Sequence, residues 1–279
     1  MKTIINLINP ERSQVKYELT VFPDGEPHIK LEEIDRKKEY RIVCRVTNPS
    51  ELFVLAQVGY ILKRQDVIFD IEITYLMSMR MDRVISFNEA FTLQIVAGII
   101  NALGAEKVYI FEAHSERVFK EIFNSRPYDP LQKTSEFSKF ENEFILNFDN
   151  AICFPDHGAL DRYGFMVSPR VKKLCMKKVR DLENKGVIKS MELESFIDDD
   201  IPVITIIDDL CDGGGTFCWA SSILREKYPN AKIQIFVKHL VNPVGLKKIA
   251  ETFDDVYITN SYKDWDVSEY PNVHVFKVA

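Results

Sequence analysis

The sequence predicts an α/β protein with mainly parallel sheets. Short apolar runs typical of buried strands alternate with segments of helical spacing along the chain. The clearest strand is Val203–Ile207, a run of apolar or β-branched residues. The clearest helix is Asn88–Leu103, which Gly104 is expected to end.

The other elements follow in order. In the first half, strands are expected at Tyr17–Phe22, Arg41–Val46, Val67–Leu76 and Lys107–Ala113, with a helix at Ser50–Gln65 that places Leu52, Leu55, Val58 and Leu62 on one face. In the second half, strands are expected at Ala151–Phe154, Ile233–Val237 and Val256–Thr259, with a helix at Phe217–Lys227. Residues 126–150 are the least periodic, so we place a domain boundary near residue 140, within about ten residues. This gives domains 1–140 and 141–279.

Composition narrows the functional class. The chain has 279 residues and a formal net charge of −6, which argues against broad nucleic-acid binding. It has no apolar run long enough to span a bilayer, and its first residues lack the pattern of a signal peptide, so no membrane partner is expected. Its five cysteines include no C-x-x-C pair and predict reduced thiols in a cytoplasmic protein.

The stretch after Val203–Ile207 carries the strongest chemical signal. Asp208 and Asp209 are expected to close the strand, and a glycine run leads to Thr216, a residue type that can cap the next helix. Glycines let backbone N–H groups approach a ligand, and a helix N-terminus favours anions. With carboxylates placed for sugar hydroxyls, the stretch predicts a cradle for a ribose phosphate.

A glycine-rich loop or an aspartate pair alone is often only a turn or a solvated surface. Taken together, in this order, the residues resemble the phosphoribosyl pyrophosphate (PRPP) binding motif. Type I phosphoribosyltransferases and PRPP synthetases both carry that motif, so this stretch does not separate the two families.

Four further segments separate them: Phe22-Pro-Asp-Gly-Glu26, Met79-Arg-Met-Asp-Arg83, Phe111-Glu-Ala-His-Ser-Glu116, and Phe154-Pro-Asp-His-Gly158 with Arg162. In this order, with the acidic loop last, they resemble PRPP synthetase (ribose-phosphate diphosphokinase) from about residue 17 to the end. A phosphoribosyltransferase is not expected to carry the first three. The resemblance implies two tandem type I phosphoribosyltransferase-like domains, an N-terminal ATP-side domain and a C-terminal ribose-phosphate domain, in a homo-oligomer, either a dimer or a hexamer.

The resemblance also implies roles. The ATP site would use Arg80 and Asp82, and the turn with Phe22, Asp24 and Glu26 would reach the adenine of a neighbouring subunit. Mg²⁺ would be held by His114 and Asp156. A mobile catalytic loop would supply Lys178 and Arg180, and the ribose phosphate would be bound by Asp208, Asp209, Asp212, Gly213, Gly214, Gly215 and Thr216.

The chemistry suits these residue types. The anomeric hydroxyl of a ribose phosphate attacks the β-phosphorus of ATP, and AMP leaves. Such a transfer needs positioning and charge neutralisation more than a strong base, and Mg²⁺ prefers hard oxygen ligands. Asp208, Asp209 or a metal-bound water remain alternative general bases.

Structural interpretations compete with several of these roles. A histidine such as His114 is more often packed or exposed than a ligand, although the end of a parallel strand favours ligand binding. His157 and His239 lie near similar strand ends and are not expected to be ligands. The basic run Lys172–Arg180 ordinarily indicates a solvated face, and the turn at Phe22–Glu26 has an ordinary interpretation as well. Phe87, Phe91 and Phe111 are expected in the core.

The chain departs from the family pattern in places. Met81 replaces a glutamine, Glu112 an aspartate, Ala159 a glycine, and Gly213 a threonine of the phosphate loop. The last change leaves room for a diphosphate, so ADP-ribose is an alternative acceptor to ribose 5-phosphate. Phage-borne relatives make ADP-ribose pyrophosphate in this way for rebuilding NAD⁺. A further alternative is an inactive homologue that regulates a true synthetase.

Overall fold

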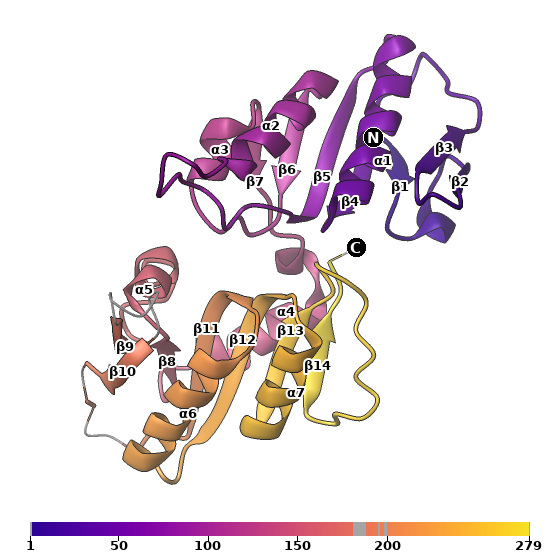
Figure 1. Cartoon of the computed structure of the whole chain (residues 1–279). Helices are drawn as coiled ribbons and strands as arrows, with labels where there is room; N and C mark the ends of the chain where they lie inside the picture. Colours follow the sequence, from indigo (N-terminus) through magenta and orange to yellow (C-terminus); the bar gives the residue numbers. More distant parts are fainter. Residues whose placement is uncertain (1, 181–187, 195, 198–199, 279) are drawn as a thin grey trace. The chain divides into compact units, whose positions relative to one another are not determined.

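The computed structural model describes residues 2–180, 188–194, 196–197 and 200–278, except the side chains of residues 179, 180, 188 and 189. The chain divides into two compact units, Met1–Pro130 and Leu131–Val278 (Figure 1). The division after residue 130 lies ten residues before the predicted boundary near residue 140, so residues 131–140 belong to the second unit. In the described residues, none of the helices has the length and apolar character needed to cross a bilayer.

The first unit is built on a parallel sheet in the order β1-β4-β5-β6-β7. Its strands are β1 (Thr3–Asn6), β4 (Tyr40–Val46), β5 (Phe69–Leu76), β6 (Lys107–Ile110) and β7 (Ser125–Pro127). The crossovers contain α1 (Pro49–Arg64), α2 (Thr92–Leu103) and α3 (Arg117–Glu121). Because strand and helix alternate and the ladders are parallel, this unit confirms the predicted class.

Helix α1 shows why the sequence predicted it. Asn48 caps the helix by accepting a hydrogen bond from the Glu51 backbone N–H, and the Glu51 carboxylate accepts one from the N–H of Thr47, just before the cap, in an arrangement close to a capping box. Pro49 takes the first helical position. The predicted apolar face, Leu52, Leu55, Val58 and Leu62, is buried.

Helix α2 begins later than predicted. The sequence places its start at Asn88, but the structure begins it at Thr92, and Phe91 precedes it without a side-chain cap. Phe87 is fully exposed, which corrects its expected place in the core, whereas Phe111 is 1% exposed as predicted. Gly104 ends the helix with φ of +75°, the left-handed conformation that glycine adopts without strain.

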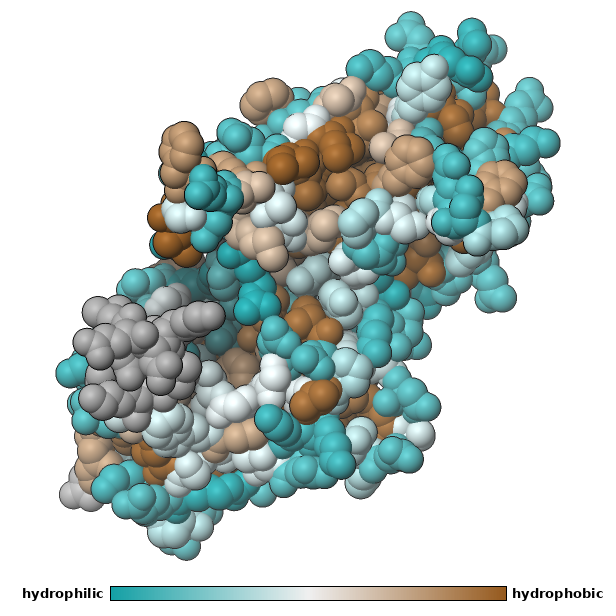
Figure 2. Space-filling model, in the orientation of Figure 1, coloured by the Kyte–Doolittle hydropathy of each residue, from teal (hydrophilic) through white to brown (hydrophobic). Residues whose placement is uncertain are grey.

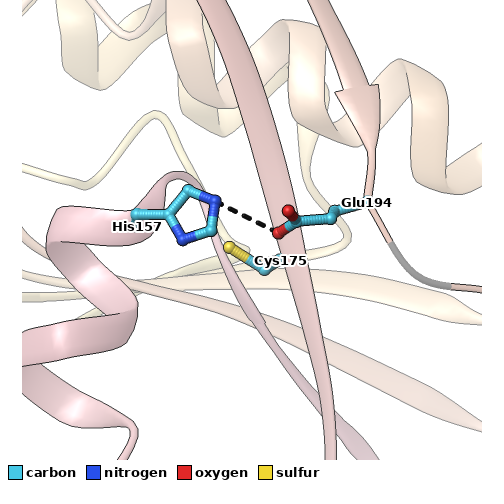
Figure 3. Close-up of side chains that lie close together, drawn as sticks. All are labelled: His157, Cys175 and Glu194. Carbon is cyan, nitrogen blue, oxygen red and sulfur yellow. Dashed lines mark ion pairs between the residues drawn. The ribbon is translucent and has the colours of Figure 1, made fainter.

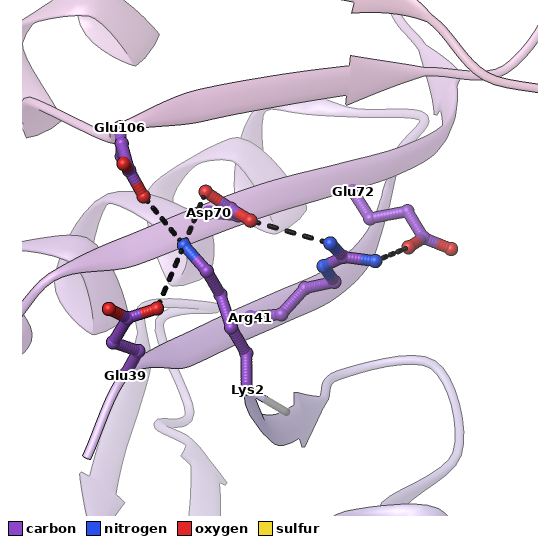
Figure 4. A network of polar contacts seen from close by, with 6 residues as sticks. All are labelled: Lys2, Glu39, Arg41, Asp70, Glu72 and Glu106. Atoms are coloured by element: carbon purple, nitrogen blue, oxygen red, sulfur yellow. Dashed lines mark hydrogen bonds and ion pairs between the residues drawn. The ribbon is translucent and has the colours of Figure 1, made fainter.

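Ion pairs between charged residues link the starts of neighbouring strands in the first unit (Figure 4). The buried Asp70 carboxylate of β5 lies 2.9 Å from Lys2 Nζ and 3.4 Å from Arg41. Lys2 also lies 2.7 Å from Glu106, at the start of β6. These ion pairs lie at the amino ends of the strands, where they link neighbouring strands rather than line a ligand edge.

A separate antiparallel hairpin completes the first unit. It is formed by β2 (Tyr17–Val21) and β3 (Pro27–Leu31). Gln57 of α1 anchors it, because its side chain accepts from the Ile29 N–H and donates to the Pro27 carbonyl. The surface of this unit keeps apolar side chains exposed (Figure 2); on α2, Ile95 and Ile99 are 57% and 39% exposed.

The second unit has a sheet in the order β10-β9-β8-β11-β12-β13-β14, parallel except for the β9–β10 pair. Its strands are β8 (Ala151–Phe154), β9 (Lys172–Arg180), β10 (Ile188–Leu193), β11 (Val203–Cys211), β12 (Lys232–Leu240), β13 (Asp255–Thr259) and β14 (Val273–Phe276). Its helices include α4 (Ser135–Phe140), α5 (His157–Tyr163), α6 (Gly215–Lys227) and α7 (Pro243–Thr252).

Aromatic packing explains why residues 131–140 join this unit. Phe137 and Phe140 of α4 lie against Phe236 of β12 and Phe276 of β14, with ring centroids 5.3–5.6 Å apart. Aromatic side chains bury a large apolar area, so these contacts fix α4 on the second sheet.

Two local predictions in this unit are corrected. The strand predicted at Val203–Ile207 continues to Cys211 because β12 pairs with it as far as Leu240. The basic run Lys172–Arg180, expected to be a solvated face or a mobile loop, forms strand β9. It pairs with β8 on one side and β10 on the other, so its backbone is held in the sheet.

Candidate active site

The carboxyl edge of the second sheet gathers predicted site residues. β8 pairs with β11 through Cys153 and Ile206, so the chain leaves β8 just where Asp208 and Asp209 follow on β11. Phe154 also aligns with Cys175 of β9, which brings Lys178 to the same edge. Parallel strands present their carboxyl ends together, and ligands bind there in open α/β sheets.

Two ion pairs join the side chains at this edge. Lys178 Nζ lies 2.6 Å from Asp156 Oδ2, and the lysine side chain is only 10% exposed. Asp156 Oδ1 accepts from the Ala159 N–H, which caps α5. Arg162, on the same helix, lies 2.9 Å from Asp209 Oδ2. Helix α5 therefore helps to fix Lys178 through Asp156 and fixes Asp209 directly.

Asp208 lies in surroundings that disfavour its charged form. Burial, the charge of the neighbouring Asp209 carboxylate and that of Asp156 raise the pKa of Asp208 well above its usual range. Hard carboxylate oxygens with such raised basicity are the donors that Mg²⁺ prefers. The residues present therefore fit a magnesium ion on chemical grounds.

The glycine loop follows β11 directly. Gly214 is the N-cap of α6, with φ of +75°, and its carbonyl accepts from the N–H groups of Phe217 and Cys218. The sequence expected Thr216 to be the cap, but Thr216 lies inside the first turn. Asp212, at the start of the loop, accepts from Asn242 Nδ2 at 3.0 Å.

Close packing fixes one side of this loop and leaves the other open. A Cβ atom added to Gly245 of α7 would lie 1.8 Å from the Asp212 carbonyl oxygen, so that glycine is required for the close approach. A Cβ atom added to Gly213 or Gly215 would meet nothing within 4 Å. The loop thus combines a fixed backbone, the N-terminus of a long helix and free space, which suits a phosphate group.

In the first unit, Asp82 and His114 lie close together beyond the ends of β5 and β6. Asp82 is 9% exposed, and its carboxylate lies 3.0 Å from Arg83 Nε. Burial opposes ionisation, but hydrogen bonds from Arg83 and Ser115 and the charges of Arg83 and His114 lower the pKa of Asp82. Arg80 is exposed on the same segment. The arrangement offers one carboxylate, one imidazole and cations for a polyphosphate.

The predicted adenine-contacting residues lie at the tip of the β2–β3 hairpin. Phe22 is 46% exposed, and Asp24 and Glu26 are exposed as well. Asp24 accepts from the Glu26 N–H, and Gly25 takes a φ of +89°, so the tip is a defined turn. Arg180 ends β9, but its side chain lies outside the described part of the structure.

One residue at the second-unit edge was missed from the sequence. Lys238 of β12 is 7% exposed, and its Nζ lies 5.5 Å from the centre of the Tyr163 ring. A lysine within a mostly apolar run, Ile233–Leu240, is the signal that could have identified it, because lysine is rarely buried without a partner. His239, in contrast, is fully buried and pairs with Ser261 at 2.8 Å, which is a structural role.

Comparison with known proteins places the chain. No family model matches it. The ribose-phosphate pyrophosphokinase of Mycoplasmopsis pulmonis is 25% identical over 274 residues, covering 93% of this chain and 81% of that protein. Ribose-phosphate pyrophosphokinase 1 of Listeria monocytogenes is 25% identical over 251 residues, covering 88% of this chain and 77% of that protein. These similarities support the interpretation of this chain as a divergent relative of the PRPP synthetases.

The fold agrees with this assignment. The crystal structure of phosphoribosylpyrophosphate synthetase from Mycobacterium smegmatis superposes with a TM-score of 0.80, at 17% identity, over 99% of this chain and 95% of that one. The predicted α/β class with mainly parallel sheets is thus confirmed, and the relatives named above support the predicted resemblance to PRPP synthetases. The roles of individual residues in this PRPP synthetase relative stay predictions.

Proposed function

We propose that the protein transfers the β,γ-diphosphate of ATP to the anomeric hydroxyl of ribose 5-phosphate, giving PRPP and AMP. Its relatives named ribose-phosphate pyrophosphokinase, at about a quarter identity over most of the chain, support a diphosphotransferase of this type. The observation that carries the proposal is the cluster of Asp156, Lys178, Asp208 and Asp209 beside an open glycine loop.

In this proposal the second unit binds the acceptor. Backbone N–H groups of the loop, from Gly213 to Thr216, hold the 5′-phosphate at the start of α6. The carboxylates of Asp208 and Asp209 accept hydrogen bonds from the ribose hydroxyls, with Arg162 keeping Asp209 in place. Lys178 contacts the diphosphate that is transferred.

The first unit binds the nucleotide. Arg80 and Asp82 contact ATP, and the hairpin tip with Phe22, Asp24 and Glu26 reaches the adenine bound by a neighbouring subunit. His114 is a candidate Mg²⁺ ligand of this unit, and Asp156 is a candidate Mg²⁺ ligand of the second unit. The ion, when bound, neutralises charge on the phosphate oxygens, which is the main requirement of phosphoryl transfer.

The reaction balances without a further reactant. The anomeric oxygen forms a bond to the β-phosphorus, and the bond from that phosphorus to the α,β-bridging oxygen breaks, so AMP leaves with the electron pair. The hydroxyl proton passes to Asp208, because the raised pKa of its carboxyl group suits a proton acceptor. Lys178 offsets the charge that accumulates on the transferring oxygens.

The test follows AMP formation. Protein, ATP, Mg²⁺ and ribose 5-phosphate are expected to yield AMP and PRPP in equal amounts. AMP formation that does not depend on acceptor, or ADP in place of AMP, would contradict diphosphate transfer. Absence of AMP with every acceptor would instead favour the inactive regulatory homologue, for which Met81 in the ATP segment is the motivating residue.

A second candidate function has a specific observation in its favour. The open space at Gly213 leaves room that a threonine side chain would fill, so the same loop has room for a diphosphate. The acceptor would then be ADP-ribose and the product ADP-ribose pyrophosphate, which serves NAD rebuilding. Parallel assays with ribose 5-phosphate and with ADP-ribose separate the two candidates, because the two products differ in mass.

A further inference from the structure

A histidine, a cysteine and a glutamate meet beside the candidate active site (Figure 3). The candidate ligand atoms of His157, Cys175 and Glu194 all lie within 4.8 Å of one another. His157 Nε2 is 3.1 Å from Glu194 Oε2. Cys175 is buried, whereas the histidine and the glutamate are exposed, so the group is reachable from solvent on one side.

The backbone brings these side chains together from three elements. Cys175 lies on β9, and the Glu194 N–H donates to the Cys175 carbonyl at 2.9 Å, which holds Glu194 opposite it. Residues directly opposite on antiparallel strands present their side chains to the same face. His157 begins α5, three residues after Phe154, the β8 residue that aligns with Cys175. Backbone pairing therefore holds Cys175 and Glu194, and the start of α5 holds His157.

The spacing suits a tetrahedral metal ion. Zinc binds sulfur at about 2.3 Å and nitrogen or oxygen at about 2.0–2.2 Å, which places ligand atoms roughly 3.3–3.8 Å apart. The distance from His157 Nε2 to Glu194 Oε2 is 3.1 Å. Cys175 Sγ lies no more than 4.8 Å from the other two ligand atoms, so a small side-chain rotation would bring it to the distance that zinc requires. Three protein ligands leave a fourth position for water.

The ligand types select the ion. Thiolate and imidazole are the ligands of zinc and related transition ions, whereas Mg²⁺ takes hard oxygen donors. We propose that His157, Cys175 and Glu194 bind a zinc ion, separate from the magnesium of phosphoryl transfer. This replaces the expectation from the sequence that His157 is not a ligand, and it does not depend on the identity of the acceptor.

The position gives the ion a positioning role. Cys175 lies three residues before Lys178 on β9, and His157 directly follows Asp156, the partner of Lys178. A zinc ion would therefore cross-link the β9–β10 hairpin to the start of α5. This link would hold the Lys178–Asp156 pair in register with the acceptor loop.

Cobalt spectroscopy on the metal-stripped full-length chain tests the site. One equivalent of Co²⁺ is expected to produce thiolate-to-metal charge-transfer absorption with intense tetrahedral bands. Zn²⁺ should abolish this spectrum, and excess Mg²⁺ should not. Cys175→Ser should remove the charge-transfer absorption, while Cys218→Ser, which changes a thiol on α6, should retain it.

A second measurement keeps the test independent of folding defects. His157→Asn changes an exposed side chain, so the fold should persist, and zinc affinity should fall by at least about tenfold. Zinc should raise the Tm of the wild type and of Cys218→Ser but not that of Cys175→Ser. Wild-type protein without charge-transfer absorption, or a Cys175→Ser variant that keeps it, would overturn the proposal. Unchanged zinc affinity in His157→Asn would remove the histidine from the site.

Discussion

Replacing Lys178 with alanine separates a catalytic from a structural role for this lysine. Its Nζ lies 2.6 Å from Asp156 Oδ2, and the two side chains are 10% and 36% exposed. The substitution leaves the Asp156 carboxylate without this cation, but water and the Ala159 N–H still reach it. Because the carboxylate is about one-third exposed, we expect a loss of folding free energy of only about 1 kcal/mol.

The expected effect on catalysis is larger. Removing a donor that stabilises charge in the transition state typically costs about 3–4 kcal/mol, or roughly 10²–10³ in kcat. Lys178→Ala should therefore lower the rate of AMP release by that factor, measured at saturating ATP and acceptor. Urea unfolding of the same variant should show little change.

The neighbouring lysine provides the matched control. Lys177 is 54% exposed, and its partner Glu192 lies on β10 at 3.7 Å. Lys177→Ala removes the same charge from the same strand and should retain activity within about threefold, as expected for a surface ion pair. If both variants lose activity equally, or if Lys178→Ala retains the wild-type rate, the assigned role of Lys178 is wrong.

Three further predictions follow. Gly213→Thr should fold normally, because an added Cβ meets nothing within 4 Å, and it should keep its activity with ribose 5-phosphate. If ADP-ribose is the acceptor, the kcat/KM of the variant for ADP-ribose should fall at least about tenfold, because the threonine side chain would occupy the space of the diphosphate. Asp208→Asn should lower activity by roughly tenfold to a hundredfold by losing a charged hydrogen-bond acceptor. Asp208→Asn should also stabilise the fold at neutral pH. The raised pKa means that the native state binds the Asp208 proton more tightly than the unfolded state, so the stability of the wild type falls as pH rises from the pKa of the unfolded state to that of the folded state. Urea unfolding at pH 4 and 7 should therefore show a wider stability difference between variant and wild type at pH 7. Asp82→Asn should destabilise the protein by about 1 kcal/mol at pH 7, and the gap should close as pH falls through the lowered native pKa of Asp82; a gap that persists in acid would exclude ionisation as the cause.

Much of the fold was predictable from the sequence because the burial pattern is regular. The apolar face of α1 and the buried strand at Ala151–Phe154 lie where periodicity placed them. The order and spacing of the short motifs along the chain indicated the family, because they depend on the arrangement of the whole chain and not on one local turn.

The errors have physical causes that local sequence does not contain. Asp208 and Asp209 appear to end a strand because carboxylates are rare in sheets, yet pairing with β12 continues it to Cys211. The basic run of β9 looks like a solvated face because its own residues do not reveal that β8 and β10 pair with it on either side. Thr216 is a good cap by residue type, but Gly214, with its positive φ, takes that position.

The sequence was also insufficient to predict the contacts within the candidate site. The sequence could name Asp156 and Lys178, but it could not show that they form an ion pair at a shared sheet edge. The group formed by His157, Cys175 and Glu194 has no recognisable spacing, because its members come from three separate elements.

Product analysis by mass spectrometry tests the central claim most directly. The protein is incubated with ATP and Mg²⁺, and either ribose 5-phosphate or ADP-ribose is supplied. We expect AMP together with an acceptor that has gained one diphosphate group, and we expect this product with ribose 5-phosphate. A product from ADP-ribose alone would move the function to the second candidate. An acceptor that gains a single phosphate, with ADP released, would contradict diphosphate transfer altogether.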